Sequence, residues 1–497
     1  MPLRVAFLAA ECEPWAKTGG LADVVDALAR ALGRLSGRPV GTVDVYLPRY
    51  REVRVPAAAD RHDLRLPDPH APTGATDVAI VDVAADGYRL RFVDHAAAFD
   101  RAGIYGDEHG DYGDNAWRFG LFCRAALEAI RRDPERVDVL HLHDWHATPA
   151  SILRAGPYAD DPAIGTAAVV HTLHNLAYHG WTPREQLPQL GLAPGDGIVP
   201  AEVERFDLLR TGIELADLVT TVSERFAQEA LTPEFGRGLE GSLLALGDRF
   251  SGILNGLDPV VWDPLHDPAL AAPYGARDRT GKLACRRDLL GAIGFEPDDD
   301  GAVLGMIGRL DPQKGFDLLA AAAPELLARG ARIVVMGTGQ AALADSFRAL
   351  AAADPRRVAL IERFDRAVAR RVYAGIDLFV MPSRFEPCGQ GQMIALRYGT
   401  PPIVRRVGGL AESVIDVGER PDAGTGFVFD DARPEALVEA CLRAIACRTA
   451  GGAGWEALLD RAMAADFDWE RGAAPRYVET YRRAVAIRAR RTGAAPD

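Results

Sequence analysis

The sequence predicts an α/β protein built from two doubly wound domains, and three observations support this. The chain has 497 residues, more than one hydrophobic core usually holds, so two domains of roughly 200–250 residues are expected. Short apolar runs alternate with segments of helical periodicity, which is typical of a parallel sheet covered by helices on both faces. The alternation stops near Gly256 and then starts again.

The first half contains short apolar runs with the length of buried strands. They are residues 5–10, 43–47, 137–142, 167–172 and 218–222. Segments with apolar residues at helical spacing, 21–35 and 116–131, separate several of these runs. Parallel strands need such crossover connections, so the first domain is expected to contain a parallel sheet.

The second half repeats this alternation more regularly. Its expected strands are 303–307, 332–336, 358–361, 378–381 and 402–404, and its expected helices are 316–328, 341–352, 367–374 and 391–398. A (β/α)₈ barrel with insertions is the alternative for an α/β chain of this size. The break in the middle of the chain favours two domains. Because ligands bind at the carboxyl ends of parallel strands, we expect the chemistry in a cleft between the two sheets.

The domain boundary is expected at the turn sequence 255–259, Asn-Gly-Leu-Asp-Pro, which a polar, proline-rich stretch follows to about residue 280. We therefore assign residues 1–255 to the first domain and 256–470 to the second. The last segment, 471–497, is basic and helical in pattern. It carries an apolar stripe of Tyr477, Tyr481, Val485 and Ile487, which favours a helix crossing back to the first domain over a solvated tail.

Composition excludes several classes of protein. A net charge of −13, from 70 acidic and 57 basic residues, argues against a non-specific nucleic-acid binder. The six cysteines lack the spacing of a zinc site or a disulfide framework and indicate thiols in a reducing cytoplasm. The amino terminus has the pattern of a strand rather than a signal peptide, and no apolar run approaches the roughly 20 residues of a membrane span.

The first candidate motif is Lys17-Thr18-Gly19-Gly20, between the first strand and the first helix. Glycines at this place let backbone amides approach an anion at a helix amino terminus. The motif is neither a Walker A loop nor G-x-G-x-x-G, which counts against an NTPase and a dinucleotide enzyme. The alternative is an ordinary turn with an exposed lysine.

Two further turns, both in the second half, have the composition of anion sites. In the segment 308–315, Arg309 and Lys314 lie five residues apart between a strand and a helix, where they would neutralise the charge that develops on a departing diphosphate. Gly408-Gly409 follows another strand and is a second candidate cradle for an anion. Isolated surface cations and a plain glycine turn are the alternatives.

Glu386 follows the strand 378–381. Gly389 comes three residues later and leads into the helix expected at 391–398. A glutamate there is either a helix cap or a group that contacts a sugar.

Two histidine-rich segments, 141–146 and 171–175, end strands of the first half. A metal site is the less favoured interpretation, because alternate residues of a strand face opposite sides and no cysteine or further carboxylate joins them. Hydrogen bonding to sugar hydroxyls, with some histidines buried, is favoured.

These motifs together resemble the bacterial glycogen synthase and plant starch synthase family. The matching segments are 17–24 (Lys-Thr-Gly-Gly-Leu-Ala-Asp-Val), 143–146 (His-Asp-Trp-His), 174–178 (His-Asn-Leu-Ala-Tyr), 255–258 (Asn-Gly-Leu-Asp) and 383–389 (Ser-Arg-Phe-Glu-Pro-Cys-Gly). Segments 309–315, 407–410 and 466–469 extend the match. They occur in the order of the family and span nearly the whole chain.

The resemblance implies a GT-B fold, in which two Rossmann-like domains face each other across a cleft. It implies a hexosyltransferase that moves glucose from ADP-glucose to the 4-hydroxyl at the non-reducing end of an α-1,4-glucan such as glycogen. ADP is released, and the anomeric configuration is retained. Neither a cofactor nor a metal is implied, and the partners are ADP-glucose and the glucan, without nucleic acid or membrane.

The resemblance also assigns roles to residues. It places Lys314 and Arg309 on the donor diphosphate and Asp144 and His174 beside the glucosyl group, while Glu386 would stabilise an oxocarbenium-like transition state. The remaining positions that it assigns to donor binding are Lys17, Gly19, Gly20, Asp23, Asn255, Phe364 (against the adenine), Cys388, Gly389, Gly408 and Gly409.

Two positions depart from related proteins. Related retaining transferases often carry a second glutamate eight positions after the first, but this chain has Ile394 there. In glycogen synthases this position is generally not acidic either. The segment 389–392, Gly-Gln-Gly-Gln, differs from the common Gly-Leu-Thr-Gln and leaves the nucleotide preference open. A sugar-nucleotide epimerase, a pyridoxal-phosphate glucan phosphorylase and a catalytically silent glucan-binding protein are the other functions considered. The phosphorylase would need a Schiff-base lysine, and the silent protein would lack Arg309 and Lys314.

Overall fold

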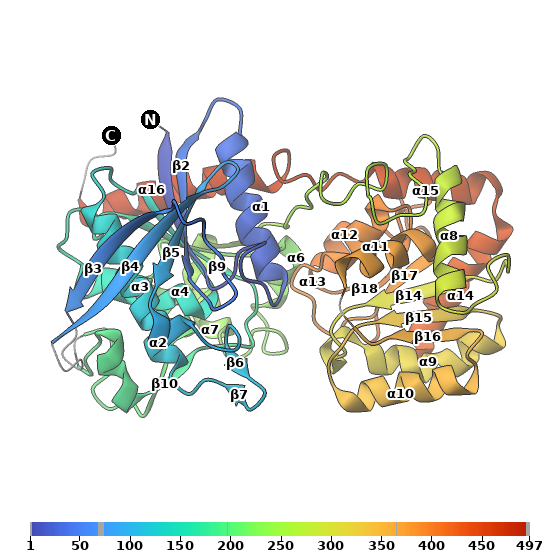
Figure 1. Cartoon of the computed structure of the whole chain (residues 1–497), viewed down its shortest axis with the longest axis horizontal. Coiled ribbons are helices and arrows are strands. Elements are labelled where there is room, and N and C mark those ends of the chain that lie inside the picture. Colours follow the sequence, from blue (N-terminus) through green and yellow to red (C-terminus); the bar gives the residue numbers. More distant parts are fainter. Residues whose placement is uncertain (1, 68–73, 196, 364, 494–497) are drawn as a thin grey trace. The chain divides into compact units, whose positions relative to one another are not determined.

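The computed structural model describes residues 2–67, 74–195, 197–363 and 365–493. The chain divides into two compact units (Figure 1). Unit 1 consists of Met1–Val222, Ala227–Gly256 and Trp469–Asp497, and unit 2 consists of Ser223–Phe226 and Leu257–Asp468. The division therefore falls at Gly256 and again at Trp469, where the chain returns to unit 1.

The main sheet of unit 1 contains nine strands in the described part of the chain, in the order β13-β12-β9-β8-β1-β2-β5-β4-β3. The strands are β1 (Leu3–Leu8), β2 (Val40–Pro48), β3 (Asp60–Pro67), β4 (Ala75–Ala84), β5 (Arg89–Asp94), β8 (Val139–His143), β9 (Ala168–Leu173), β12 (Leu218–Thr221) and β13 (Phe250–Gly252). The short pairs are β6 (Gly106–Asp107) with β7 (Gly110–Asp111), and β10 (Trp181–Pro183) with β11 (Arg205–Asp207).

The expectation of an all-parallel sheet is wrong at one edge of unit 1. Strands β3, β4 and β5 pair antiparallel, while the other pairings of this sheet are parallel. None of these three strands was among the expected ones, and β3 in particular is a charged edge strand with only Leu64 and Leu66 buried. Charged residues of this kind protect an exposed sheet edge against pairing with other chains.

Helices cover both faces of this sheet. Its helices are α1 (Gly20–Arg34), α2 (Ala96–Phe99), α3 (Asn115–Arg132), α4 (Asp144–Ala155), α5 (Leu208–Leu215), α6 (Glu224–Glu229), α7 (Glu240–Leu246) and α16 (Ala473–Thr492), with 3₁₀ turns η1 (Arg184–Leu190) and η2 (Gly247–Arg249). Helices α3, α4 and α5 pack together on one face, and α1 and α16 pack on the other. Tyr477, Tyr481 and Ile487 of α16 are buried, and α16 contacts β8 and β9.

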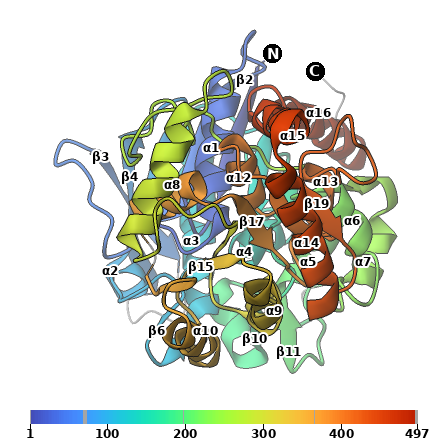
Figure 2. The same cartoon turned by 90° about the vertical axis from the view of Figure 1, so that its right-hand side faces the viewer.

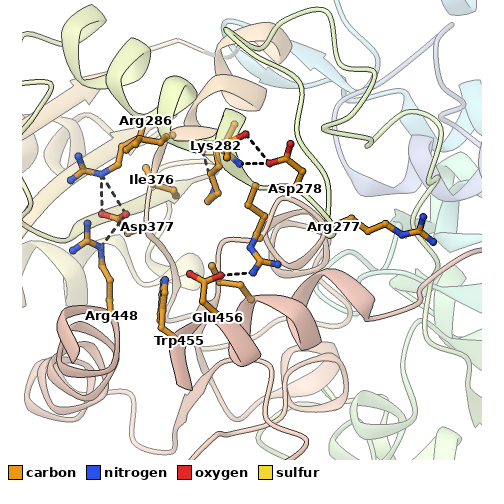
Figure 3. Close-up of a pocket in the computed structure, with 16 residues that line it drawn as sticks. Arg277, Asp278, Lys282, Arg286, Ile376, Asp377, Arg448, Trp455 and Glu456 are labelled. Atoms are coloured by element: carbon orange, nitrogen blue, oxygen red, sulfur yellow. Dashed lines mark hydrogen bonds and ion pairs between the residues drawn. The ribbon is translucent and has the colours of Figure 1, made fainter. Parts of the chain in front are cut away.

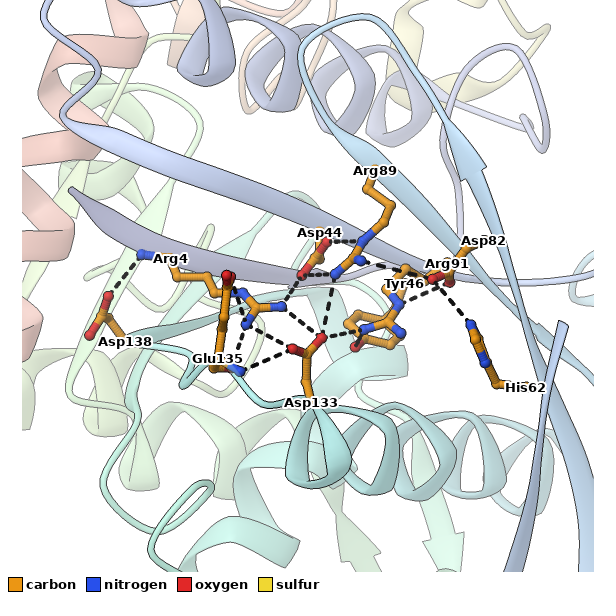
Figure 4. A network of polar contacts seen from close by, with 10 residues as sticks. All are labelled: Arg4, Asp44, Tyr46, His62, Asp82, Arg89, Arg91, Asp133, Glu135 and Asp138. Atoms are coloured by element: carbon orange, nitrogen blue, oxygen red, sulfur yellow. Dashed lines mark hydrogen bonds and ion pairs between the residues drawn. The ribbon is translucent and has the colours of Figure 1, made fainter. Parts of the chain in front are cut away.

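The amino ends of the central strands of unit 1 are joined by a network of ion pairs (Figure 4). Arg4 on β1 and Arg91 on β5 both contact Asp133, and Arg89 makes a paired contact with Asp44 on β2. Burial raises the pKa of the Asp133 carboxyl, but hydrogen bonds and charge from Arg4 outweigh it and hold this pKa at about 2. The charges at this end neutralise one another.

The sheet of unit 2 has six strands in the described residues, in the order β16-β15-β14-β17-β18-β19, and every pairing is parallel. They are β14 (Val303–Ile307), β15 (Arg332–Met336), β16 (Val358–Ile361), β17 (Leu378–Met381), β18 (Pro402–Arg405) and β19 (Phe427–Phe429). The first four match the expected bounds, because β14, β15 and β17 are largely apolar runs buried along almost their whole length and β16, at the sheet edge, is a short apolar run as well.

The helices of unit 2 are α8 (Thr280–Ala292), α9 (Phe316–Ala328), α10 (Ala341–Ala353), α11 (Arg366–Gly375), α12 (Gly391–Arg397), α13 (Gly408–Ser413), α14 (Pro434–Ala450) and α15 (Gly452–Ala464), with the 3₁₀ turn η3 (Pro312–Lys314). Helices α9, α10 and α14 lie on one face and α8, α11 and α12 on the other (Figures 1 and 2). The apolar core between α9, α10, α14 and the sheet includes Phe316, Phe347 and Leu437.

Each sheet has a switch point, a pair of neighbouring parallel strands at which the order of the strands along the chain reverses. In unit 2 these neighbours are β14 and β17, and in unit 1 they are β1 and β8. The helices that follow two such neighbouring strands leave on opposite faces, so a crevice opens at the carboxyl ends of the strands. The loops after these strands therefore form the expected ligand site of each unit.

Within the described ranges, no helix is both long enough and apolar enough to cross a membrane. The longest helix, α16, has 20 residues and a polar, arginine-rich exposed face. Its burial against the sheet accounts for its apolar residues.

Candidate active site

The loop after β1 is organised by a buried glutamate that the sequence analysis missed. The Glu11 carboxylate accepts hydrogen bonds from the Thr18 amide (2.6 Å), the Thr18 hydroxyl (2.7 Å), the Gly19 amide (2.9 Å) and the Tyr105 hydroxyl (2.6 Å). The amide of Gly19 is therefore directed at Glu11. This set of four bonds holds the Lys17-Thr18-Gly19-Gly20 turn in one conformation.

Lys17 lies at the entrance of the same loop, with carboxylates on two sides. Its Nζ is 2.5 Å from Asp23 Oδ1 and 3.4 Å from Glu13 Oε2. Asp23 is in the first turn of α1. The structure thus brings together two of the expected donor-binding residues, Lys17 and Asp23, as an ion pair. About a quarter of the Lys17 side chain is exposed.

Open space surrounds the two glycines of this turn. A Cβ added to Gly19 or Gly20 would meet no atom within 4 Å. Gly19 is also extended, with φ −149°, a conformation that any residue adopts. Packing and backbone conformation therefore do not explain glycine at either position, whereas close approach of a ligand to the backbone would.

Asp144 joins the ends of β8 and β9. It has φ 56°, a left-handed conformation that is uncommon outside glycine and costs of order 1–3 kcal/mol. Its carboxylate accepts hydrogen bonds from the amides of His174 (2.7 Å) and Asn175 (3.4 Å). Burial raises the pKa of the Asp144 carboxyl to about 7, although these amides oppose the shift. Two expected site residues, Asp144 and His174, are thus in direct contact.

The histidines of this region form a chain of neutral rings. His143 Nδ1 lies 3.0 Å from His174 Nε2, and the His141 ring lies behind the His143 ring, with centroids 4.2 Å apart. Burial lowers the pKa of His174 to about 3 and that of His141 and His143 well below the usual value. His146 turns away and stacks on Tyr105. In the described part of the chain, no three histidine, cysteine or carboxylate side chains are grouped as metal ligands.

Asn255 is buried at the end of unit 1, after β13. Its side chain is 5% exposed, and its Oδ1 has no hydrogen-bond partner among the described residues. A buried amide oxygen without a partner costs free energy. A ligand hydroxyl or amide would supply the missing donor. Phe364, the expected adenine contact, lies outside the described residues.

The loops after β14 and β17 meet in an ion pair in unit 2. Lys314 Nζ lies 2.6 Å from Glu386 Oε2, and the Ser383 hydroxyl donates to the same oxygen at 3.0 Å. Glu386 is 5% exposed, and α12 begins only at Gly391. The cap interpretation of Glu386 is therefore wrong, because its carboxylate bonds to side chains and not to helix amides. Arg309 is more open, with its side chain 58% exposed and Asp311 at 3.8 Å.

Glycines allow close packing around Glu386. A Cβ at Gly408 would lie 2.0 Å from the Glu386 carbonyl oxygen, and one at Gly409 would lie 2.2 Å from the Cys388 carbonyl oxygen. The Gly409 amide donates to the Glu386 carbonyl at 3.1 Å. Close approach between α13 and the loop 386–389 thus explains both glycines, and this contact fixes the backbone that carries Glu386.

The loop is supported from two more sides. Gln392, on α12, donates from Nε2 to the carbonyls of Cys388 (3.0 Å) and Gly389 (3.2 Å). Arg384 makes a two-pronged contact with Asp317 of α9, with both distances 2.7 Å. Gly389 has φ 72°, which favours glycine because a Cβ there is strained. Cys388 and Gly389 are therefore held rigidly beside Glu386.

Lysine is rare in this chain. Of 57 basic residues, three are lysines, namely Lys17, Lys282 and Lys314. Lys282 has a structural role, because its Nζ donates to the carbonyls of Ala374 and Tyr398 and to the Thr400 hydroxyl at 2.7–3.1 Å. The other two are Lys17, in the loop after β1 of unit 1, and Lys314, in the loop after β14 of unit 2. A compact ammonium with three donors differs from a planar guanidinium, so this choice indicates a specific requirement.

Unit 2 contains a cavity of about 590 Å³ (Figure 3). None of the expected site residues lines it. Three of the arginines that line it have carboxylate partners: Asp377 lies between Arg286 and Arg448, and Arg279 pairs with Glu456. The cavity is thus a charged recess apart from the expected site residues, and it is not the candidate site.

Sequence analysis missed Glu11, Tyr105, Ser383 and the contact of His143 with His174. Ser383 was part of a matched motif, and His143 belonged to a histidine-rich segment, so both had a local signal. Tyr105 had none, because it lies 94 positions from Glu11 and comes from a loop without periodicity. Only the folded chain brings these two side chains together.

Comparison with known proteins agrees with this geometry. Residues 4–245 match the model of the starch synthase catalytic domain, and residues 301–447 match that of glycosyl transferases group 1. A glycogen synthase from Syntrophotalea carbinolica is 39% identical over 489 residues, covering 98% of this chain and 99% of the relative. One from Anaeromyxobacter dehalogenans is 43% identical over 484 residues, covering 97% and 99%.

The chain belongs to the glycogen and starch synthase family.

Solved structures agree with this assignment. The catalytic domain of starch synthase IV from Arabidopsis thaliana, bound to ADP and acarbose, has a TM-score of 0.88 and 32% identity, covering 98% of this chain and 100% of that one. A sucrose-phosphate synthase from Thermosynechococcus elongatus, at 18% identity and a TM-score of 0.60, covers 97% and 99% and shares the fold. The expected GT-B fold is confirmed, and the chain is a glycosyltransferase of the family that elongates glucans.

Proposed function

We propose that this protein transfers glucose from ADP-glucose to the 4-hydroxyl at the non-reducing end of an α-1,4-glucan, with retention of the anomeric configuration. The observation that carries the proposal is the Lys314–Glu386 pair at the crevice between β14 and β17. It places a cation and a carboxylate where a sugar diphosphate needs both. The relative bound to ADP and acarbose supports adenine as the base and a glucan-like acceptor.

The chemistry requires stabilisation of two opposite charges. As the bond between C1 of glucose and the phosphate oxygen breaks, its electrons move to the diphosphate, and positive charge develops on the sugar ring. Lys314 offers three N–H donors, and one is directed at Glu386. The other two can bind phosphate oxygens, with Arg309 adding a fork of donors from the same loop.

Glu386 stabilises the positive charge that develops on the sugar ring. Its carboxylate lies beside the rigid backbone of Cys388 and Gly389, so it is already oriented before substrate binds. A fixed carboxylate stabilises an oxocarbenium-like centre without reorganisation at the moment of reaction. The acceptor oxygen then forms the new bond to C1 on the face that the diphosphate leaves, and its proton passes to the departing phosphate oxygen.

His174 and Asp144 orient the glucosyl group. Because desolvation keeps His174 neutral, it acts by hydrogen bonding and not by charge, which suits a sugar hydroxyl. Asp144 holds the His174 backbone through the amide bond at 2.7 Å. In the same proposal, Lys17 binds the donor diphosphate, the open turn at Gly19 and Gly20 lets the diphosphate approach the backbone closely, and the Asn255 side chain binds a donor hydroxyl.

We also propose that the reaction needs no metal and no cofactor, because lysine and arginine supply the positive charge that a divalent cation would. The glucan phosphorylase alternative would require a lysine free to form a Schiff base. Lys282 is bonded to three oxygens, Lys314 to Glu386 and Lys17 to Asp23, so these contacts do not favour a phosphorylase. The six cysteines are free thiols, which supports a reducing compartment such as the cytoplasm.

Parallel incorporation assays test the function. Purified protein is given glycogen with radiolabelled ADP-glucose, UDP-glucose or glucose 1-phosphate, each with and without excess EDTA. We expect incorporation from ADP-glucose, little from UDP-glucose, none from glucose 1-phosphate, and no effect of EDTA. Digestion by a β-amylase should release the label as maltose, because that enzyme cleaves α-1,4 links from the non-reducing end.

Other outcomes would contradict separate parts of the proposal. Incorporation from glucose 1-phosphate would indicate a phosphorylase. Loss of activity in EDTA that Mg²⁺ restores would contradict a diphosphate site built from side-chain cations alone. Label that resists the β-amylase would contradict the linkage and the retained configuration.

A further inference from the structure

The last helix of the chain reaches the histidines of the candidate site through one hydroxyl. Tyr481 of α16 has its OH 2.8 Å from His141 Nδ1, across 340 positions of sequence. Both side chains are fully buried. A hydroxyl and an imidazole in a core must bond to each other or to something else, because an unpaired polar group there costs free energy.

The direction of this hydrogen bond follows from the partners of each group. Tyr481 keeps its proton, because burial raises its pKa well above the usual value, and His141 is neutral. The Tyr481 hydroxyl satisfies its proton by donating it to His141 Nδ1. His141 then carries its own proton on Nε2 and donates it to the Thr172 hydroxyl at 2.6 Å, which bonds in turn to the Thr220 hydroxyl at 2.7 Å.

The His141 ring packs against the ring of His143. Its imidazole lies 4.2 Å from that of His143, and Phe7 packs against both, with centroids 4.6 and 5.1 Å away. His143 is fully buried, and its Nε2 has no partner among the described residues. A buried acceptor without a partner is tolerated better than a buried N–H without one. His143 therefore carries its proton on Nδ1 and donates it to His174 Nε2 at 3.0 Å.

This arrangement determines which nitrogen His174 offers. Since its Nε2 accepts from His143, the neutral ring carries its proton on Nδ1. His174 is less buried than His143, so this nitrogen is the one left for a ligand. We propose that Tyr481 is a positioning residue for His174: through His141 and His143 it fixes the ring so that Nδ1–H is presented as a donor to a hydroxyl of the donor sugar.

The inference rests on the proposed function, in which His174 contacts the glucosyl group. Its test is the kinetics of Tyr481→Phe, which removes one hydroxyl and keeps the ring. The matched control is Tyr477→Phe, because Tyr477 lies beside the same imidazole at 5.4 Å and its change leaves the Tyr481–His141 bond in place. We expect Tyr481→Phe to lower kcat/KM for ADP-glucose by about 3- to 10-fold, the effect of one buried hydrogen bond, with KM for glycogen unchanged.

A double-mutant cycle separates positioning from general destabilisation. If Tyr481 acts through His174, Tyr481→Phe has no further effect on kcat/KM in a His174→Ala background. An equal loss in both backgrounds would overturn the proposal, and so would an equal effect of Tyr477→Phe. Thr172→Val removes the other partner of His141 and should reproduce the loss in milder form, which covers the case in which Tyr481→Phe folds poorly.

A spectroscopic readout keeps the inference testable apart from activity. ¹⁵N spectra of labelled histidine distinguish protonated from unprotonated ring nitrogens. We expect wild-type His141 to carry its proton on Nε2 and His174 on Nδ1, and the His174 signals to move in Tyr481→Phe. The opposite tautomer of His174 would overturn the proposal even in an active enzyme. Correct tautomers in a protein that transfers no glucose would instead contradict the proposed function.

Discussion

Lys314 Nζ and Glu386 Oε2 lie 2.6 Å apart, although 72 positions separate the two residues in the sequence. The contact exists because β14 and β17 are neighbours in the sheet, so the loops that follow them leave the same edge. A cation that is expected to bind phosphate and a carboxylate that is expected to face the sugar are thus parts of one unit.

The first prediction concerns Lys314. Lys314→Ala should lower kcat by a factor on the order of 10² to 10³, or roughly 3–4 kcal/mol, because the ammonium binds the diphosphate most strongly when charge accumulates in the transition state. Steady-state kinetics with ADP-glucose measures the effect. Arg329→Ala is the control, because Arg329 is a cation of the same unit with its side chain 61% exposed, and it should change kcat by less than about twofold. A folded Lys314→Ala protein with native kcat would remove Lys314 from the mechanism.

The second prediction uses the scarcity of lysine. Because the chain has three lysines, ¹³C-lysine labelling yields three side-chain εCH₂ signals, which Lys→Arg variants assign. We expect saturating ADP to shift the signals of Lys17 and Lys314 and to leave that of Lys282 in place, since Lys282 is bonded to protein oxygens. A Lys17 signal that does not respond, beside a Lys314 signal that does, would show that Lys17 does not bind the diphosphate.

The third prediction is a pH dependence of stability. The pKa of Asp144 is raised to about 7 by burial, whereas in the unfolded chain it is about 3.9. The native state thus binds a proton that the unfolded state has lost, and the stability from this group is present at low pH and is lost as the pH rises to 7. Relative to Asp144→Asn, the wild type should lose about 2 kcal/mol of unfolding free energy between pH 5 and pH 7.

Urea unfolding of both proteins at the two pH values measures this difference. Asparagine keeps an oxygen that accepts from the His174 amide, so the variant removes the titration and preserves the shape. The buried histidines are present in both proteins, so their contribution to the pH dependence of the unfolding free energy cancels in the comparison. A constant difference in stability between pH 5 and pH 7 would show that Asp144 does not titrate in this range.

The fourth prediction concerns the glycine that fits against the loop of Glu386. Gly409→Ala would place a Cβ 2.2 Å from the Cys388 carbonyl oxygen and 2.5 Å from the Cys388 Cα, and backbone atoms cannot move aside cheaply. We expect kcat to fall by about tenfold or more, because small displacements of catalytic groups are costly. Gly454→Ala in α15 is the control, since its Cβ would meet nothing within 4 Å. Native kcat in Gly409→Ala would mean that the loop tolerates displacement.

The sequence by itself was sufficient to predict elements whose hydrophobic pattern is local. Strands β14, β15 and β17 are largely apolar runs buried along almost their whole length, and β16 is an apolar run at the sheet edge, so their bounds could be predicted without the fold. Strand β3 could not, because it alternates charged and apolar residues at a sheet edge. Helix α4 was also missed, since it starts within a histidine-rich motif and contains Pro149, which normally ends a helix.

The residue types of the candidate site could likewise be predicted, because glycine turns, cations and a carboxylate at strand ends are local signals. Their partners could not. Glu11 binds the Lys17 turn together with Tyr105, Glu386 binds Lys314, and Tyr481 binds His141. Periodicity describes one segment at a time, whereas these contacts depend on which strands are neighbours and where the last helix packs. The sequence therefore determined which chemical groups the protein has, and the tertiary structure decided which of them are held together.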